Sequence, residues 1–182
     1  GIEKRTGWHP FFDRGNPIGL RNMGAVGGIS LEPGGQFELS GAPQLTIHDA
    51  AAELDSHLED CRAVGGPLNI HFLGLGVTPI WSVGDIPAMP KSRYGIMTPY
   101  MNKVGTLGTS MMYRSATVQA NLDFSDEADM VKKLRVSVAL QPIVTALFAN
   151  SPFVDGKLSG YLSFRSHIWL NTDRARTGML PF

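Results

Sequence analysis

The residues best suited to chemistry are two glutamates, Glu32 and Glu38, on either side of the sequence Pro33-Gly34-Gly35. Both fall on the polar face of an alternating stretch, Ile29 to Pro43, which predicts a half-buried strand that bends or bulges at the proline and glycines. Two carboxylates re-aimed by a bulge could bind a hard cation such as Mg²⁺, which takes oxygen ligands and keeps substrate phosphates in its shell. The alternative is a water-facing polar edge, with Pro-Gly-Gly as a turn between two short strands.

A second candidate site is a row of short, neutral, hydrogen-bonding side chains. From Met111 to Phe124 polar and apolar residues alternate, which predicts a strand. Water-facing strands usually carry lysine, glutamate and arginine, whereas neutral polar groups suit an enclosed site that orients a ligand. The pattern alone leaves site and solvent face equally open. The polar face carries Tyr113, Ser115, Thr117, Gln119, Asn121 and Asp123.

Arginines paired with aromatic residues form the third group. Arg93 and Tyr94 lie in a segment with helical spacing, Pro90 to Met101. The residue pattern alone predicts that Arg93 is a surface residue. Between Ser159 and Leu170 the pattern fits a strand or a helix, and in both cases Arg165 and Trp169 share a face. The turn Asp173 to Gly178 adds Arg174 and Arg176, side chains suited to bidentate phosphate or carboxylate contacts.

Helices and strands must position these groups. Thr46 and Asp49 predict a capping box, followed by a helix that ends at Gly65-Gly66-Pro67. Leu68 to Gly76 predicts a buried strand with His71 in the core. Ser125 predicts the N-cap of a helix that continues into the core stretch Val136 to Ala149, with a kink at Pro142 and a buried stripe of Met130, Val131, Leu134, Val138 and Leu147.

Composition narrows the functional classes. The 182 residues suffice for one sizeable domain, and 43% are hydrophobic. Sixteen basic residues balance sixteen acidic ones, so we expect neither nucleic acid nor membrane as a partner, but small molecules. The longest apolar stretch is broken by polar residues and is shorter than the roughly 20 residues of a membrane span. One cysteine, Cys61, and no signal-peptide core lead us to expect a reducing, cytoplasmic location.

Several stretches resemble the glutamate–cysteine ligases of the plant and proteobacterial type. They follow one another without large gaps from about Ser30 onward. The matching stretches are S-L-E-P-G-G-Q-F-E-L-S-G-A-P from Ser30, T-V-Q-A-N-L-D-F from Thr117, L-Q-P-I-V-T-A-L-F-A-N-S-P-F from Leu140, R-S-H-I-W from Arg165 and R-T-G-M-L-P-F from Arg176.

The resemblance implies an α+β fold, a glutamine-synthetase-like antiparallel sheet that forms a cup backed by helices. It also implies that residues 1–182 are the central part of a single catalytic domain, without the upstream acidic strand and the C-terminal part. The implied reaction joins the γ-carboxylate of glutamate to the amine of cysteine through a γ-glutamyl phosphate, the first step of glutathione biosynthesis. The implied partners are glutamate, cysteine and ATP, with a homodimer left open.

The resemblance also implies roles for individual residues. Glu32 and Glu38 are implied as ligands of Mg²⁺. Arg93 and Arg165 are implied to bind the glutamate carboxylate or the transferring phosphate. Arg176, which the plant relatives keep, is implied at the nucleotide phosphates. The remaining substrate-binding residues implied are Tyr94, Thr117, Gln119, Asn121 and Trp169.

Two rival interpretations remain open. One is a related carboxylate–amine ligase that has the same chemistry but uses a different amine. It stays open because the sequence does not show which residues form the amine pocket. A non-catalytic domain would keep the fold but lack the acidic strand expected before Gly1. Plant relatives are expected to carry a redox-sensitive cysteine near the position of Ala51, so a plant-type disulfide switch is not expected here, and Cys61 is expected to be a small buried hydrophobe.

Overall fold

The computed structural model describes residues 1–178 and 180. The chain has two compact units, which we call the first and the second unit. The first unit comprises Gly1–Leu73 with Pro87–Gly95, and the second comprises Gly74–Ile86 with the described residues from Ile96 onward. Residues 179, 181 and 182, at the end of the motif that begins at Arg176, lie outside the described residues.

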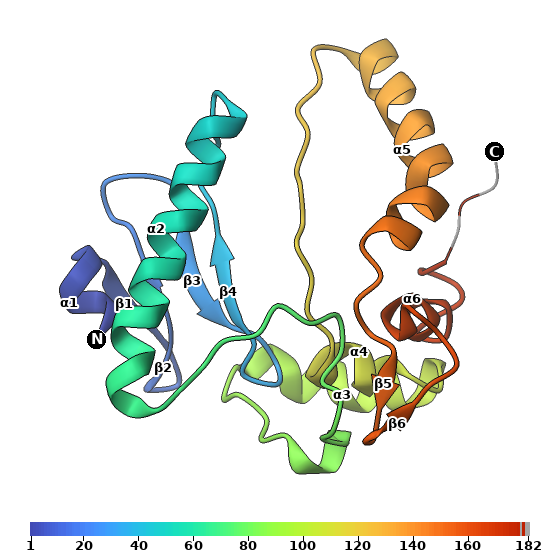
Figure 1. Ribbon diagram of the computed structural model, residues 1–182, viewed down its shortest axis with the longest axis horizontal. Coiled ribbons are helices and arrows are strands. Elements are labelled where there is room, and N and C mark those ends of the chain that lie inside the picture. Colours follow the sequence, from blue (N-terminus) through green and yellow to red (C-terminus); the bar gives the residue numbers. More distant parts are fainter. Residues whose placement is uncertain (179, 181–182) are drawn as a thin grey trace. The chain divides into compact units, whose positions relative to one another are not determined.

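A four-stranded antiparallel sheet in chain order, β1-β2-β3-β4, organises the first unit (Figure 1). Its strands are β1 (His9–Asp13), β2 (Asn16–Arg21), β3 (Gly28–Leu31) and β4 (Phe37–Ser40). Ile18 and Ile29 are buried in it. Gly19 has no side chain because a Cβ there would collide with the Ile29 carbonyl oxygen and the Phe11 ring.

Helices precede and follow this sheet in the chain. A short α1 (Ile2–Thr6) precedes it, and α2 (Ile47–Gly65) follows it and leads into the 3₁₀ turn η1 (Gly66–Leu68). The predicted capping box at α2 is confirmed: the Thr46 side chain accepts from the Asp49 backbone, and the Asp49 side chain accepts from the Thr46 backbone. His57 of α2 stacks on Phe37 of β4 with ring centroids 5.6 Å apart.

The stretch with the two glutamates is a hairpin. Leu31 faces Phe37 and Ser30 faces Glu38 across β3 and β4. The turn between them closes with Gly35 donating its N–H to the Glu32 carbonyl, and Gly35 has a φ of 81°, which glycine adopts without strain. The expected single strand with a bend or bulge is therefore wrong, and the turn between two short strands is confirmed. The water-facing part of that alternative holds for Glu38 but not for Glu32, whose side chain is 22% exposed.

The second unit is mainly helical. It holds most of α3 (Ser92–Val104), together with α4 (Gly108–Arg114), α5 (Glu127–Leu147) and α6 (Phe164–Leu170). Short elements complete it: the 3₁₀ turn η2 (Val83–Asp85) and the hairpin of β5 (Phe153–Val154) and β6 (Lys157–Leu158). Its most buried side chains are Met112, Ile168, Val77 and Thr172.

The loop between α3 and α4 is fastened to the end of α6. The backbone N–H groups of Thr106 and Leu107 both donate to the Asn171 carbonyl, at 3.1 and 3.0 Å. Gly105 permits this approach, because a Cβ there would collide with the carbonyl oxygens of Asn171 and Thr172.

Two predicted strands are wrong. Residues 108–114 are helical, and the following segment to Phe124 is an extended tube that joins α4 to α5 (Figure 1). In the described part of the chain no strand pairs with residues 117–124, and alternation without a neighbouring strand cannot make a ladder. Leu68 to Gly76 is likewise irregular beyond η1, and His71 is exposed rather than in the core.

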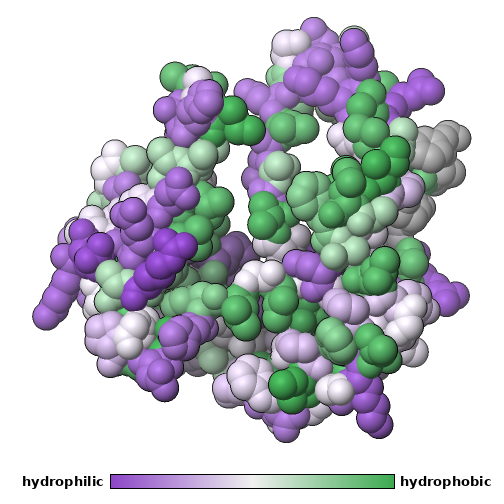
Figure 2. All heavy atoms as spheres, in the orientation of Figure 1, coloured by the Kyte–Doolittle hydropathy of each residue, from purple (hydrophilic) through white to green (hydrophobic). Residues whose placement is uncertain are grey.

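The helix expected after Ser125 is present, but its predicted burial is wrong. α5 is N-capped by Asp126, one residue later than expected, and none of its residues is buried. Leu134 and Leu147 are 51% and 73% exposed, and hydrophobic residues show at the surface over the lower part of this helix, below its hydrophilic upper end (Figure 2). Among the described residues no helix has the length and apolarity to span a bilayer.

Candidate active site

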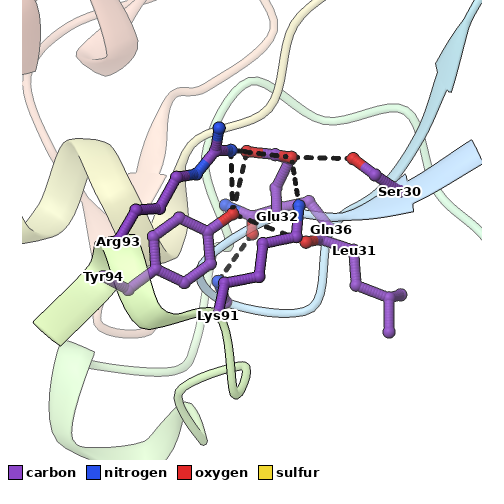
Figure 3. A network of polar contacts seen from close by, with 8 residues as sticks. Ser30, Leu31, Glu32, Gln36, Lys91, Arg93 and Tyr94 are labelled. Carbon is purple, nitrogen blue, oxygen red and sulfur yellow. Dashed lines mark hydrogen bonds and ion pairs between the residues drawn. The ribbon is translucent and has the colours of Figure 1, made fainter. Parts of the chain in front are cut away.

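Glu32, just beyond β3, is the centre of a polar cluster in the first unit (Figure 3). Its Oε1 accepts from Lys91 Nζ at 3.1 Å and from Ser30 Oγ at 2.9 Å. Its Oε2 accepts from Arg93 Nη2 and from the Tyr94 hydroxyl, both at 3.2 Å. Three groups predicted for the site, Glu32, Arg93 and Tyr94, are thus brought together across some 60 residues of chain.

Hydrogen bonds join the sheet and its hairpin turn, which carries Glu32, to the segment that carries Lys91 and Arg93. The Met89 N–H donates to the carbonyl of Pro33, in the hairpin turn, at 2.9 Å. At the start of α3, Ser92 donates its N–H and its hydroxyl to the Asp13 carboxylate, at 2.6 and 2.8 Å. These hydrogen bonds lower the pKa of Asp13, which therefore remains an anion beside the helix N-terminus.

The two cations on Glu32 differ in exposure. The Lys91 side chain is 7% exposed and that of Arg93 is 59% exposed, with Glu32 between them at 22%. Partial burial alone would raise the pKa of the Glu32 carboxyl, but hydrogen bonds from Lys91 and Ser30 and the two positive charges outweigh it and lower the pKa. The Tyr94 hydroxyl and nearby carboxylates raise the pKa of Arg93.

The cluster opens on a surface pocket of about 420 Å³ within the first unit. Glu38 and Ser40 of β4 line it with Glu32, Lys91 and Arg93. Such a pocket offers cationic and anionic groups to one small polar ligand.

The pocket's donor set fits Mg²⁺ only in part. The described residues contain no group of three or more histidine, cysteine or carboxylate side chains placed to hold a metal ion. Mg²⁺ is often bound by one or two carboxylates with water and phosphate oxygens completing the shell, and Glu32 and Glu38 could supply these two. Glu38 is exposed, whereas Glu32 would have to share its oxygens with Lys91 and Arg93.

Arg165 and Trp169 lie together on α6 of the second unit, so the helical alternative for this segment is the correct one. The guanidinium carbon lies 5.6 Å from the centroid of the Trp169 ring. Arg165 Nε and Trp169 Nε1 are buried donors with no hydrogen-bond acceptor among the described residues. Burial lowers the pKa of Arg165. Unsatisfied buried donors on one helix would gain from a ligand that brings its own acceptor oxygens.

Arg176, also in the second unit, is held by two neighbours. Its Nη1 donates to Asp173 Oδ2 at 2.8 Å and to the Tyr100 hydroxyl, which itself donates to the same carboxylate oxygen at 2.8 Å. The Asp173 side chain is 6% exposed and that of Arg176 is 68% exposed. One edge of the guanidinium is therefore fixed while the rest faces solvent.

Comparison with known proteins identifies the family. The model of glutamate-cysteine ligase family 2 (GCS2) matches residues 12–182. The chain belongs to this family.

Three glutamate–cysteine ligases named as chloroplastic are similar over the whole chain. Ligase A of Oryza sativa subsp. japonica is 57% identical over 182 residues, and the ligases of Medicago truncatula and Arabidopsis thaliana are each 58% identical. The match covers 37%, 35% and 34% of these relatives, so the chain spans about a third of the length of the curated relatives it matches.

These names contradict the expected cytoplasmic location, because the similar ligases are chloroplastic. The expectation relied on a single cysteine and on composition. Cysteine content and composition reflect redox conditions and solubility, which several compartments share, and do not identify the compartment.

Other residues predicted from the resemblance to GCS2 ligases belong to the second unit. Thr117, Gln119 and Asn121 are exposed on the extended segment between α4 and α5. Nothing in the structure tests their assignment to substrate, which stays a prediction.

Sequence reasoning missed several charged residues that make ion pairs or hydrogen bonds in this GCS2 chain. Lys91, Asp13, Asp173 and Arg114 were not singled out, although Arg114 is 7% exposed and pairs with Asp155 at 2.9 Å. Their partners lie far away in the sequence or in turns, so no periodic pattern marks them. The only available signal was the position of Lys91 within the Pro-Lys-x-Arg-Tyr segment.

Proposed function

We propose that the full-length protein is an ATP-dependent ligase that joins the γ-carboxylate of glutamate to the amine of cysteine, the first step of glutathione biosynthesis. The observation that carries this proposal is the family match over residues 12–182, with 57–58% identity to named glutamate–cysteine ligases across the whole chain. Two further features support the proposal, because both could bind the anionic groups of glutamate and ATP: the polar cluster beside its pocket and the unsatisfied donors of α6.

The reaction needs anions to be bound and oriented. A γ-carboxylate oxygen attacks the γ-phosphorus of ATP and ADP leaves; the cysteine amine then attacks the acyl carbon of γ-glutamyl phosphate and inorganic phosphate leaves. Arginines suit both steps because the guanidinium is always charged and binds carboxylate or phosphate with two parallel hydrogen bonds. We assign these anions to Arg93, supported by Tyr94, and to Arg165.

The remaining assignments follow the same logic. Arg176 would contact nucleotide phosphates through the edge that Asp173 and Tyr100 leave exposed. Thr117, Gln119, Asn121 and Trp169 would orient the substrates. Glu32 and Glu38 would hold Mg²⁺, and a bound Mg²⁺ supplies charge neutralisation at the phosphates.

For the architecture, we propose that the four-stranded sheet is part of a larger antiparallel, glutamine-synthetase-like cup. Residues 1–182 would then form the central part of one catalytic domain. The observed sheet, antiparallel throughout and in chain order, is compatible with this extension. A homodimer remains a prediction, which sedimentation of the full-length protein would test.

The test is phosphate release by the full-length protein supplied with ATP, Mg²⁺ and glutamate, with cysteine and then other amines added. We expect cysteine-dependent turnover in the wild type. Glu38→Ala should lose turnover if Glu38 holds the ion. Turnover with a different amine alone would replace cysteine in the proposal, and no glutamate-dependent turnover with any amine would refute the ligase.

A further inference from the structure

Glu32 has two positively charged partners, and only one of them is accessible. Lys91 Nζ contacts Oε1 at 3.1 Å and is almost entirely buried, whereas Arg93 Nη2 contacts Oε2 at 3.2 Å and is largely exposed. Arg93 Nη2 also lies 3.4 Å from Oε1, but Lys91 has its own hydrogen bond to that oxygen, so Lys91 keeps its contact when Arg93 leaves. The two ion pairs are thus separable.

Lys91 is fixed in place and Arg93 is able to move. The Lys91 N–H donates to the Met89 carbonyl at 2.9 Å, and the Lys91 carbonyl accepts from the Tyr94 N–H at 3.0 Å. The ammonium group also lies 5.6 Å from the centroid of the Tyr94 ring. Arg93 contacts Glu32 only through its terminal Nη2, which also donates to the Tyr94 hydroxyl at 3.2 Å, and its side chain is 59% exposed and lines the pocket.

We propose that Lys91 is a positioning residue: it is the permanent counter-ion of Glu32, which allows Arg93 to exchange Glu32 for the carboxylate or phosphate of a bound substrate. This inference rests on the proposed function, in which Arg93 binds such an anion. Without Lys91, the departure of Arg93 would leave a half-buried carboxylate with no positively charged side chain beside it, which is costly. With Lys91 in place, the carboxylate stays paired and Arg93 is available to the ligand.

Three substitutions in the full-length enzyme test this role. Lys91→Met removes the counter-ion, Lys91→Arg keeps the charge, and Lys103→Met is the matched control at an exposed lysine near the end of α3, the helix that begins directly after Lys91. Steady-state kinetics would be measured with glutamate, ATP and cysteine varied in turn, and thermal unfolding would be recorded for each variant.

Arg93 should stay on Glu32 in Lys91→Met, so KM should rise about five- to tenfold for the substrate that Arg93 binds, with a smaller change in kcat. A rise for glutamate identifies a carboxylate and a rise for ATP identifies a phosphate. Lys91→Arg should restore KM to near the wild-type value, and Lys103→Met should leave it unchanged.

Two results would overturn the inference. One is a folded Lys91→Met enzyme with the KM values of Lys103→Met. If Lys91→Met does not fold, Lys91→Gln takes its place, and failure of both neutral variants to fold would make Lys91 a purely structural residue. A wild-type enzyme without glutamate-dependent turnover refutes the proposed function itself, which is a distinct outcome.

Discussion

Glu32 and Glu38 belong to one hairpin, and the same substitution should affect them very differently. Glu32→Gln keeps the shape of the side chain but removes the charge that Lys91 faces at 3.1 Å. With an effective dielectric constant of about 20, the Coulomb attraction at that distance is roughly 5 kcal/mol. The cost of burying both charges offsets much of this attraction, and an amide oxygen can still accept one hydrogen bond. We therefore expect the free energy of unfolding to fall by about 2 kcal/mol.

Glu38→Gln is the matched control. Glu38 is exposed and pairs with Ser30 only through the strand register, so its substitution should change the free energy of unfolding by less than about 0.5 kcal/mol. Urea unfolding of both full-length variants, with hydrogen exchange read at β3 and the start of α3, measures the difference. Equal losses of stability, or a loss confined to Glu38→Gln, would refute the view that Glu32 is the anchor of this cluster.

Three further predictions concern other parts of the chain. Tyr100→Phe removes the hydroxyl that binds both Asp173 and Arg176, so KM for ATP should rise several-fold with little change in kcat, and an unchanged KM would argue against a nucleotide role for Arg176. The Tyr100 hydroxyl and Arg176 lower the pKa of Asp173 below 3.8, so this carboxylate stabilises the fold fully above about pH 4. That contribution is lost as pH falls through the lowered pKa; melting temperatures recorded against pH should therefore decline less steeply below pH 4 for Asp173→Asn. Burial raises the pKa of Cys61, so its thiol should react slowly with a disulfide reagent. The activity of Cys61→Ala should therefore respond to oxidants and reductants as the wild type does.

Local signals in the sequence were sufficient for several elements. The capping box at Thr46 depends on residues three positions apart, and the turn at Gly35 depends on a glycine with positive φ. Arg165 and Trp169 share a face whatever the element, so their contact was predictable without choosing between strand and helix. Only three members of the polar cluster were predictable, because the family resemblance named Glu32, Arg93 and Tyr94 but not Lys91.

The failures share a different cause. The segment from Ala116 to Phe124 has the alternation of a strand, yet a strand also requires a partner, and alternation does not supply one. α5 has apolar residues all along its length, yet burial requires something to cover them. Lys91 is separated from Glu32 by 59 positions, a distance at which no sequence periodicity operates.

Gly105 has a consequence for how the second unit can respond to a ligand. Its missing side chain lets Thr106 and Leu107 grip the carbonyl of Asn171, immediately after α6. Two backbone hydrogen bonds thereby join the α3–α4 junction to the end of α6, so a movement of the whole helix that carries Arg165 and Trp169 would disturb them. A methyl group at Gly105 would collide with the carbonyl oxygens of Asn171 and Thr172, and if Arg165 and Trp169 bind substrate as proposed, it would alter substrate affinity without touching either side chain.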